Sequence, residues 1–320
     1  MAASMPNNTF ATYEAVGNRE DLSNMIYRID PTDTPFFSAC EKTKATAVNH
    51  EWQTQALAAA DVTNAQLEGA DPDTNQTTPT VRLGNIAQIS YKVARVSGTQ
   101  QAVDHAGRDN ELSYQEMLKG LELKRDLETI LLYNQKKATG SDTVARNCAS
   151  VLSWIKTNTN KGTGAAADPG TADGNATRTD GTQRAFTEAQ LKSTLASIWT
   201  NGGKPNTIYT GSFNKQAFSM FVGRASPIED TKSKRIIASV TAYESDFGDL
   251  KVVADRFLRQ RDVLVLQSDM WGVAHISGRK MVSIVLAKTG DSDRRQILSE
   301  YTLEARNEKS SGGIFDLTTA

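Results

Sequence analysis

The chain has 320 residues, and 38% of them are hydrophobic, which is enough to build a folded core and excludes a disordered or fibrous protein. Its 36 Lys and Arg nearly balance 37 Asp and Glu, so the formal net charge is -1 at pH 7. This balance excludes the strongly basic composition of a dedicated nucleic-acid-binding protein. The chain has no apolar run of about 18 residues and no basic, apolar leader, so we expect neither a membrane span nor a secretory signal, but a cytoplasmic setting.

Cysteine and histidine, the residues that most often bind metals or catalyse, are few. Cys40 and Cys148 are far apart, which predicts two buried free thiols rather than a disulfide framework or a zinc site. The histidines, His50, His105 and His275, form no metal-ligand pair. We therefore expect no metal and no cofactor.

The N-terminal residues are predicted to form an arm rather than a packed domain. Apolar residues at helical spacing favour a short helix over 21–29, and Asp30-Pro31 ends it, because a residue before proline disfavours the helical region. An extended stretch follows over 30–37 and ends in Phe36 and Phe37. These two rings either fasten the arm to the chain's own core or anchor it on a neighbouring molecule, and the sequence leaves both alternatives open.

Two strands are predicted next, over 47–57 and 80–99, separated by a loop rich in Ala, Asp, Asn and Thr. An unbroken strand over the second segment would span roughly 60 Å at about 3.3 Å per residue, more than the roughly 50 Å diameter of a globule of this size. We expect such a hairpin to protrude and to expose strand edges that pair readily with another chain. A break at Gly84-Asn85 is the alternative.

A long helix is predicted over 110–137. At 100° per residue its apolar side chains form two rows on roughly opposite sides, namely Leu112, Leu123, Leu127 and Ile130 in one and Tyr114, Leu118, Leu121 and Leu132 in the other. Such a helix is expected to lie between two packing layers.

The remaining sequence predicts a polar loop and then a mixed α/β region. Residues 158–182 are rich in Gly, Asp, Asn and Thr, which favours a flexible, solvated loop, and they lack the P-loop pattern. The elements expected after it are helices over 186–199, capped by Thr187, and 213–222, strands over 207–210, 251–254, 262–266 and 271–275, a hairpin of 281–287 with 296–306, and a returning strand over 312–317.

No catalytic motif is complete. Asp291-Ser292-Asp293 resembles the start of a calcium loop but lacks its glycine and final glutamate, and Asp246-Phe247-Gly248 occurs without the other kinase motifs. We expect no enzymatic activity. A hydrolase with an unrecognised site is the alternative, and it would depend on His105 or His275.

Short motifs spread over nearly the whole chain resemble, in their order, one family of viral shell proteins. They are Gly17-Asn18-Arg19-Glu20-Asp21-Leu22-Ser23-Asn24, Asp30-Pro31-Thr32-Asp33-Thr34-Pro35-Phe36, Glu51-Trp52-Gln53, Leu57, Val96-Ser97-Gly98-Thr99, Ala106-Gly107, Leu123-Lys124-Arg125-Asp126-Leu127-Glu128, Glu244-Ser245-Asp246-Phe247-Gly248, Thr289-Gly290-Asp291, Glu300-Tyr301-Thr302-Leu303 and Asn307-Glu308. This succession resembles the major capsid (head) proteins of tailed bacteriophages. The stretch 158–182 has no counterpart in the resemblance, and we expect it to be a variable surface insertion.

The resemblance implies an α+β chain with the Hong Kong 97-like capsid fold. The implied parts are an N-terminal arm over 1–45, an extended β-hairpin loop over 46–100, a peripheral domain with the long spine helix over 101–144 and 279–308, and an axial α/β domain over 145–278 and 309–320.

The implied function is self-assembly into the icosahedral or prolate shell that encloses the phage genome. The implied partners are further copies of the chain, in hexamers and pentamers, and packaged double-stranded DNA held without sequence readout. Portal, scaffold or decoration proteins are further expected partners, and no membrane is involved. The residues expected at contacts between subunits are Phe36, Phe37, Trp52, Arg82, Tyr91 and Lys92. A decoration, tail or other structural virion protein is the alternative.

Overall fold

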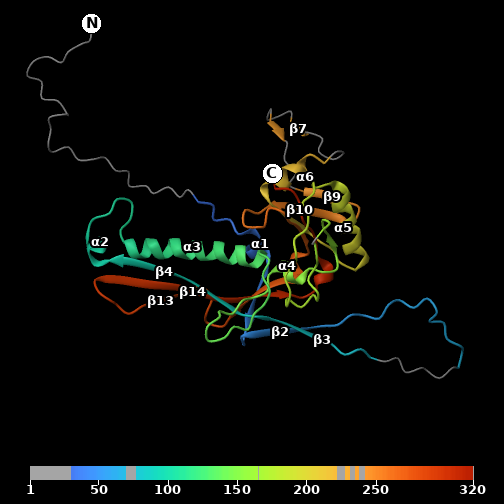
Figure 1. Ribbon diagram of the computed structural model, residues 1–320, viewed down its shortest axis with the longest axis horizontal. Helices are drawn as coiled ribbons and strands as arrows, with labels where there is room; N and C mark the ends of the chain where they lie inside the picture. The colour runs from blue at the N-terminus through green and yellow to red at the C-terminus, as the bar shows by residue number, and fades with distance from the viewer. Residues whose placement is uncertain are drawn as a thin grey trace, which may run out of the picture.

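The computed structural model describes residues 30–69, 77–164, 166–221, 228–230, 235–237 and 242–319, so the helix predicted over 21–29 lies outside the described residues. Figure 1 shows two regions side by side: one is built on the long helix α3 with strands β4, β13 and β14, and the other holds helices α5 and α6 with strands β9 and β10. None of the helices in these ranges is long and apolar enough to cross a bilayer.

The first sheet has five strands around the long strand β14. Its members are β1 (Glu41–Ala45), β4 (Gln88–Ser97), β12 (Trp271–Ile276), β13 (Val282–Val285) and β14 (Ser292–Ala305). Strand β14 pairs antiparallel with β4 along one edge and with β13 and then β12 along the other, while β1 joins β12 in parallel. The hairpin predicted over 281–306 is therefore confirmed, whereas β1 was not predicted.

Helix α3 (Glu111–Leu132) lies along one face of this sheet. It begins at Asn110, whose Oδ1 accepts a hydrogen bond from the Ser113 N–H at 2.9 Å. It ends at Leu132, five residues before the predicted end. Burial of both apolar rows is deepest near this end, where Leu123, Leu127 and Leu132 are buried, so packing on two sides applies to the C-terminal half rather than to the whole helix.

The single strand predicted over 80–99 is in fact two strands. Strand β3 (Val81–Ile86) pairs with β2 (Asn49–Thr54) in a separate two-stranded ladder, whereas β4 pairs with β14. The break is at the buried Ala87, whose N–H donates to the Val48 carbonyl at 2.8 Å, and not at Gly84-Asn85. The change of partner at this residue shortens the projecting hairpin to β2, β3 and the loop between them.

The second sheet has six strands and is covered on both faces. In order across the sheet they are β5 (Thr159–Asn160), β15 (Gly312–Ile314), β11 (Val263–Leu266), β6 (Thr207–Thr210), β10 (Gly248–Ala254) and β9 (Ala242–Ser245), and β7 (Ile228–Asp230) pairs separately with β8 (Arg235–Ile237). Strands β6 and β11 are buried along their whole length, as expected for strands with both faces covered. Helices α5 (Glu188–Thr200) and α6 (Ser212–Ser219) supply one cover.

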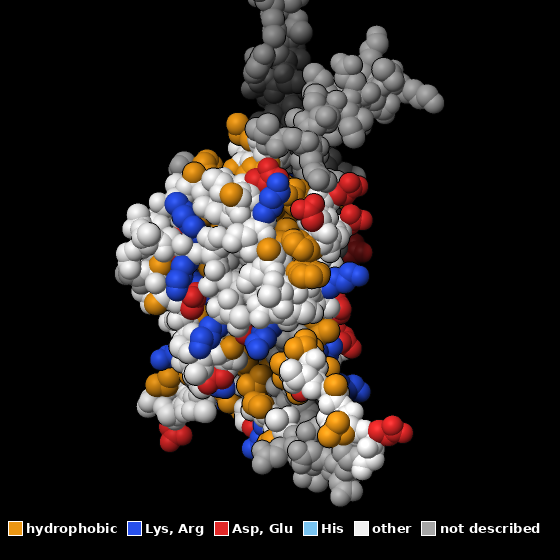
Figure 2. Space-filling model, turned by 90° about the vertical axis from the view of Figure 1, so that its right-hand side faces the viewer, with side chains coloured by type: hydrophobic (Ala, Val, Ile, Leu, Met, Phe, Trp, Pro, Cys, Tyr) orange, Lys and Arg blue, Asp and Glu red, His pale blue; other side chains and the backbone are white. Residues whose placement is uncertain are grey.

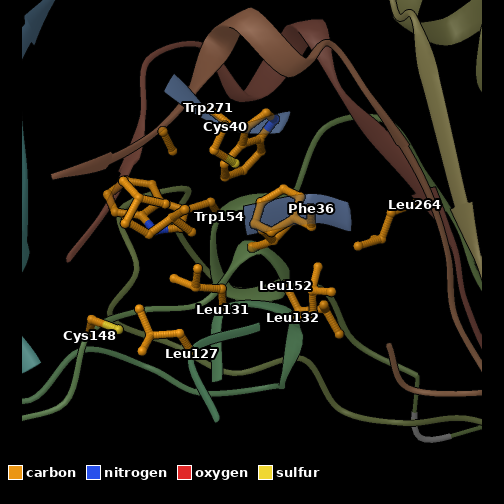
Figure 3. Close-up of a cluster of buried hydrophobic side chains, with 14 of the residues drawn as sticks. Phe36, Cys40, Leu127, Leu131, Leu132, Cys148, Leu152, Trp154, Leu264 and Trp271 are labelled. Carbon is orange, nitrogen blue, oxygen red and sulfur yellow. The ribbon is translucent and has the colours of Figure 1, made fainter. Parts of the chain in front are cut away.

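One hydrophobic core joins the two sheets. Along β11, Val263 and Val265 pack with α5 and α6, whereas Leu264 and Leu266 point the other way and pack with residues of α3, β12 and β14. The short helices α1 (Pro35–Ala39) and α4 (Val151–Trp154) add their buried side chains to the cluster that contains Leu264 and Leu266, as Figure 3 shows. The two regions of the chain are therefore held together by shared packing. The smaller elements are α2 (Gly98–Ala102), η1 (Ser268–Met270) and η2 (Glu308–Ser310).

The domain limits inferred from the resemblance stay a prediction. The resemblance implies the extended loop for strand β4 and the axial domain for β12. Both hydrogen-bond with β14 and belong to the first sheet.

The stretch 158–182 is anchored to the core by buried residues and exposed between them, so it is not solvated throughout as predicted. Asn158, Gly174 and Arg178 are buried within it. The Arg178 guanidinium lies 3.6 Å from the centre of the Phe315 ring, its Nη2 donates to the Ile155 carbonyl at 2.7 Å, and its Nη1 contacts the Asp168 carboxylate. Composition alone misleads here because these polar side chains bond to one another and to the core.

Replacing Arg178 with alanine is expected to lower the free energy of unfolding of the unassembled chain by about 3 kcal/mol, because it leaves one partner of a buried ion pair behind. Lys161 bonds to the same Asp168 at 2.7 Å but is half-exposed, so Lys161→Ala should cost less than about 1 kcal/mol. Denaturant titration measures both, and equal costs would contradict the packed arrangement.

Candidate functional site: a projecting hairpin and an open sheet face

The β2–β3 hairpin projects from the body and leaves both of its edges unpaired by the described residues. The connecting segments 55–69 and 77–80 are exposed throughout. They carry Leu57, Val62 and Leu67 with exposed fractions of 96%, 98% and 84%. Free strand edges next to exposed apolar side chains are the usual signature of a surface that binds another chain.

The base of the hairpin, by contrast, is fastened by one fully buried side chain. The Asn85 amide nitrogen donates to the Leu303 carbonyl at 2.8 Å and to the Ala149 carbonyl at 3.1 Å. Its oxygen accepts from the Ala149 N–H at 2.8 Å and the Ile86 N–H at 2.9 Å. All hydrogen-bonding positions on this amide are therefore used, and they tie β3 to both β14 and the start of α4.

Trp52 provides the matching anchor on β2. Its ring centre lies 5.4 Å from that of the buried Trp154, and its Nε1 donates to the Ala305 carbonyl at 3.0 Å. Lys137 adds a bond from its Nζ to the Gly84 carbonyl at 2.7 Å. Both strands of the hairpin thus leave the body in a fixed direction.

A group of charged side chains surrounds the same base. The Glu304 carboxylate lies 3.9 Å from His50 Nε2 and is bonded by Arg306 and by the Thr43 hydroxyl. The nearby His50 side chain, followed by bonds from Arg306 and Thr43, lowers the pKa of Glu304 to about 2. The carboxylate therefore stays ionised and links β1, β2 and β14 at ordinary pH.

The second open surface is the face of the first sheet opposite α3. Alternate residues of β4 point to this face, and Ile89, Tyr91 and Val93 are exposed along it. Ile284 of strand β13, on the other side of β14, is exposed as well. A groove of about 380 Å³ adjoins this stripe, between Ile89 and the loop 139–146.

The six residues predicted at subunit contacts lie in different surroundings. Phe36 is only 1% exposed and packs edge-on against Tyr209 at 5.7 Å, so it fastens the arm to the chain's own core (Figure 3). Phe37 is half-buried against the His275 ring at 6.1 Å. These contacts favour the first of the two alternatives left open for the arm.

Of the other four, Trp52 belongs to the base of the hairpin, and Lys92 pairs with Asp126 of α3 at 2.8 Å. Arg82, on the hairpin, and Tyr91, on the open sheet face, are exposed. The structure of one chain does not bring these six residues together into a single site, and their role between subunits stays a prediction.

Sequence reasoning missed the residues that matter most to the hairpin. Asn85 was considered only as a break in a strand, since no local pattern reveals a buried asparagine with distant backbone partners. Leu57, Val62 and Leu67 stand alone in a polar stretch, and their isolation was the available signal that the described residues leave them uncovered.

The hydrolase alternative would depend on His105 or His275, and both histidines lie among side chains that stabilise the fold. His275 is buried between Phe37 and Tyr301, and burial lowers its pKa to about 4. His105 Nε2 lies 3.1 Å from Gln100 Nε2 and 3.9 Å from the Glu111 carboxylate at the start of α3. No group of three potential metal ligands occurs in the described ranges.

Asn85→Asp is expected to lower the free energy of unfolding by about 3 kcal/mol, because an acceptor-only carboxylate would face two carbonyls that lose their donor. Asn64→Asp is the matched control in the same hairpin, since Asn64 is exposed and its Oδ1 accepts a bond that a carboxylate keeps. Denaturant titration and hydrogen exchange of 49–54 and 81–86 check this. A hairpin as well protected in Asn85→Asp as in the control would contradict it.

The chain is similar in sequence to known phage capsid proteins. The family model described as SU10 major capsid protein matches residues 5–318. The major capsid protein of Escherichia phage Phieco32 is 29% identical over 343 residues, covering 96% of each chain.

Solved structures show the same fold at low sequence identity. A chain from Gordonia phage Cozz superposes with a TM-score of 0.64 at 7% identity, covering 99% of this chain and 98% of the other. A chain from the cyanophage A-1(L) capsid asymmetric unit also gives 0.64, at 13% identity, covering 97% and 99%. The fold is thus the Hong Kong 97-like fold of phage capsid proteins, and the chain belongs to the SU10 major capsid protein family, the shell-forming proteins of tailed-phage heads.

Proposed function

We propose that this major capsid protein assembles as hexamers and pentamers into a closed icosahedral or prolate shell, with the β2–β3 hairpin of each copy lying over its neighbour. The observation that carries the proposal is the contrast within the hairpin. Its base is fixed by buried bonds of Asn85 and Trp52, whereas its outer part exposes Leu57, Val62 and Leu67 to solvent. A rigid projection with an uncovered apolar end is suited to contact another molecule.

The open sheet face supplies a second apolar surface on the same chain. It carries Ile89, Tyr91, Val93 and Ile284, on the side of the sheet that α3 leaves uncovered. Each copy therefore offers one projecting and one receiving surface, which suits repeated contacts between identical chains. Many weak contacts per copy give a stable shell, because each contact made raises the effective concentration for the next.

The packaged partner in this proposal is double-stranded DNA, held by enclosure rather than by base recognition. The net charge of -1 gives no general attraction for phosphate. On the face in Figure 2, positive and negative side chains are interspersed between apolar patches. We place assembly in the host cytoplasm, with portal, scaffold or decoration proteins as further partners of the shell.

Replacing Leu57, Val62 and Leu67 together with serine is expected to leave the unassembled chain as stable as the wild type, because the three side chains contact solvent. Assembly should fall sharply, because burying each such side chain between subunits contributes about 1.5–3 kcal/mol. Sedimentation and electron microscopy of the purified protein measure the yield of shells.

The matched control replaces three polar residues of the same segments, Asn64, Gln66 and Thr77, with serine. Those substitutions keep a polar side chain and remove at most one methyl or methylene group each, so shells should form normally. A triple variant of the apolar residues that forms shells at the wild-type yield would overturn the proposed role of the hairpin.

A further inference from the structure

A buried carboxyl group holds the arm at the point where it joins the body. Glu128 of α3 is fully buried, and its two oxygens accept the N–H groups of Phe36 and Phe37, both at 2.7 Å. These are the free N–H groups of the first turn of α1, where Pro35 has none to offer and the N-cap Thr34 makes no side-chain bond. The Glu128 carboxyl group, although distant in sequence, thus takes the place of an N-capping side chain for α1.

A second buried carboxyl group faces the first. Asp255, just after β10, is almost fully buried and interacts with Glu128 through its side chain. Its Oδ1 accepts the Phe257 N–H at 2.8 Å, whereas its Oδ2 has no conventional donor within the described part of the chain. Two adjacent buried carboxylates would repel each other, but one proton between them removes the repulsion and satisfies the remaining oxygen.

The surroundings favour retention of that proton. Burial, followed by the charge of Asp255, raises the pKa of Glu128 to about 8, and burial raises the pKa of Asp255 as well. Other titratable groups that interact with the pair are Cys40, Lys42 and Tyr209. Burial raises the pKa values of the thiol and the phenol, so both stay neutral, and Lys42 is the basic group among these three.

A cavity lies between Asp255 and the edge of the arm. It has a volume of about 440 Å³ and is lined by Asp33 and Pro35 from the arm and by Ser212, Asp255 and Arg256 from the body. Protons can therefore reach Asp255 without unfolding of the core. Asp33 and Arg256 bring charges of opposite sign to this cavity.

We propose that Glu128 and Asp255 share one proton, and that this proton closes a latch which holds residues 34–39 of the arm against the body. Loss of the proton to water in the cavity leaves two adjacent carboxylates. Their repulsion drives Glu128 away from the N–H groups of Phe36 and Phe37 and releases the arm. The latch lies within one chain, so it is independent of the proposed shell geometry.

The direction of the pH dependence follows from linkage. When the arm is released, both carboxyl groups meet water and have lost their protons above about pH 5. The closed latch keeps one proton up to about pH 8. The equilibrium constant for closing the latch is therefore largest in acid. It falls by up to about tenfold per pH unit between these limits and is constant at a lower value above them.

Hydrogen exchange of the unassembled full-length chain tests the latch. After correction for the intrinsic exchange rate, protection of the Phe36 and Phe37 amides should fall by up to about tenfold per pH unit between about pH 5 and about pH 8. A wild-type arm whose protection does not change with pH would overturn the proposal.

Asp255→Asn is the decisive variant, because its amide would donate to Glu128 while its oxygen still accepts the Phe257 N–H. This variant should keep the arm protected at all these pH values. Asp249→Asn is the matched control, since Asp249 is exposed on the same strand, β10, and it should behave as the wild type does. An unchanged pH dependence in Asp255→Asn would also overturn the latch.

A second measurement on the wild type does not depend on how the variant folds. With ¹³C placed in the glutamate side-chain carboxyls, NMR should show one glutamate titrating above about pH 7, far from the usual value of about 4.3. Its signal should move together with the loss of arm protection. Titration of every glutamate in the ordinary range would contradict the shared proton.

Discussion

A two-stranded ladder with free edges is only marginally stable in water, and this constraint underlies the proposed role of the hairpin. The β2–β3 hairpin is such a ladder. Its base is stable because Asn85 and Trp52 bond to β14 and the start of α4, but nothing in the described chain covers its outer part. One copy therefore leaves this part of the hairpin without a partner, and in the proposed function another copy of the same chain covers it.

The body that carries the hairpin is rigid enough to fix the direction in which the hairpin projects. Leu264 and Leu266 of the second sheet pack into the same core as Leu127 of α3, so the two regions do not meet through a thin interface. Phe36 adds the arm to this core. Close packing of this kind allows little adjustment, so the direction of the hairpin is set by the body rather than by its own strands.

The sequence predicted well those elements whose pattern is local. Helix α5 begins after Thr187, whose N–H donates to the Gln190 side chain, and the buried strands β6 and β11 and the β13–β14 hairpin lie near the predicted positions. Strand β1 was missed because its EKTKA sequence is mostly exposed and pairs with β12, more than two hundred residues away. The resemblance to a family, carried by many short motifs, supplied the fold that local patterns could not.

The features that failed depend on contacts between distant residues. The break at Ala87 reflects a change of partner from β2 to β14, which composition does not encode. The stretch 158–182 reads as solvated because its polar residues are counted singly, whereas Arg178, Asp168 and Phe315 form one packed group. Asn85 and the Glu128–Asp255 pair are likewise visible only in three dimensions.

A high-resolution reconstruction of the assembled shell tests the central claim most directly. The measured quantity is the solvent-exposed area of Leu57, Val62 and Leu67 in the particle, compared with the nearly complete exposure in one chain. We predict that a neighbouring copy buries most of that area and pairs with or covers the free edges of β2 and β3. A shell in which these side chains and edges remain in contact with solvent would contradict the account.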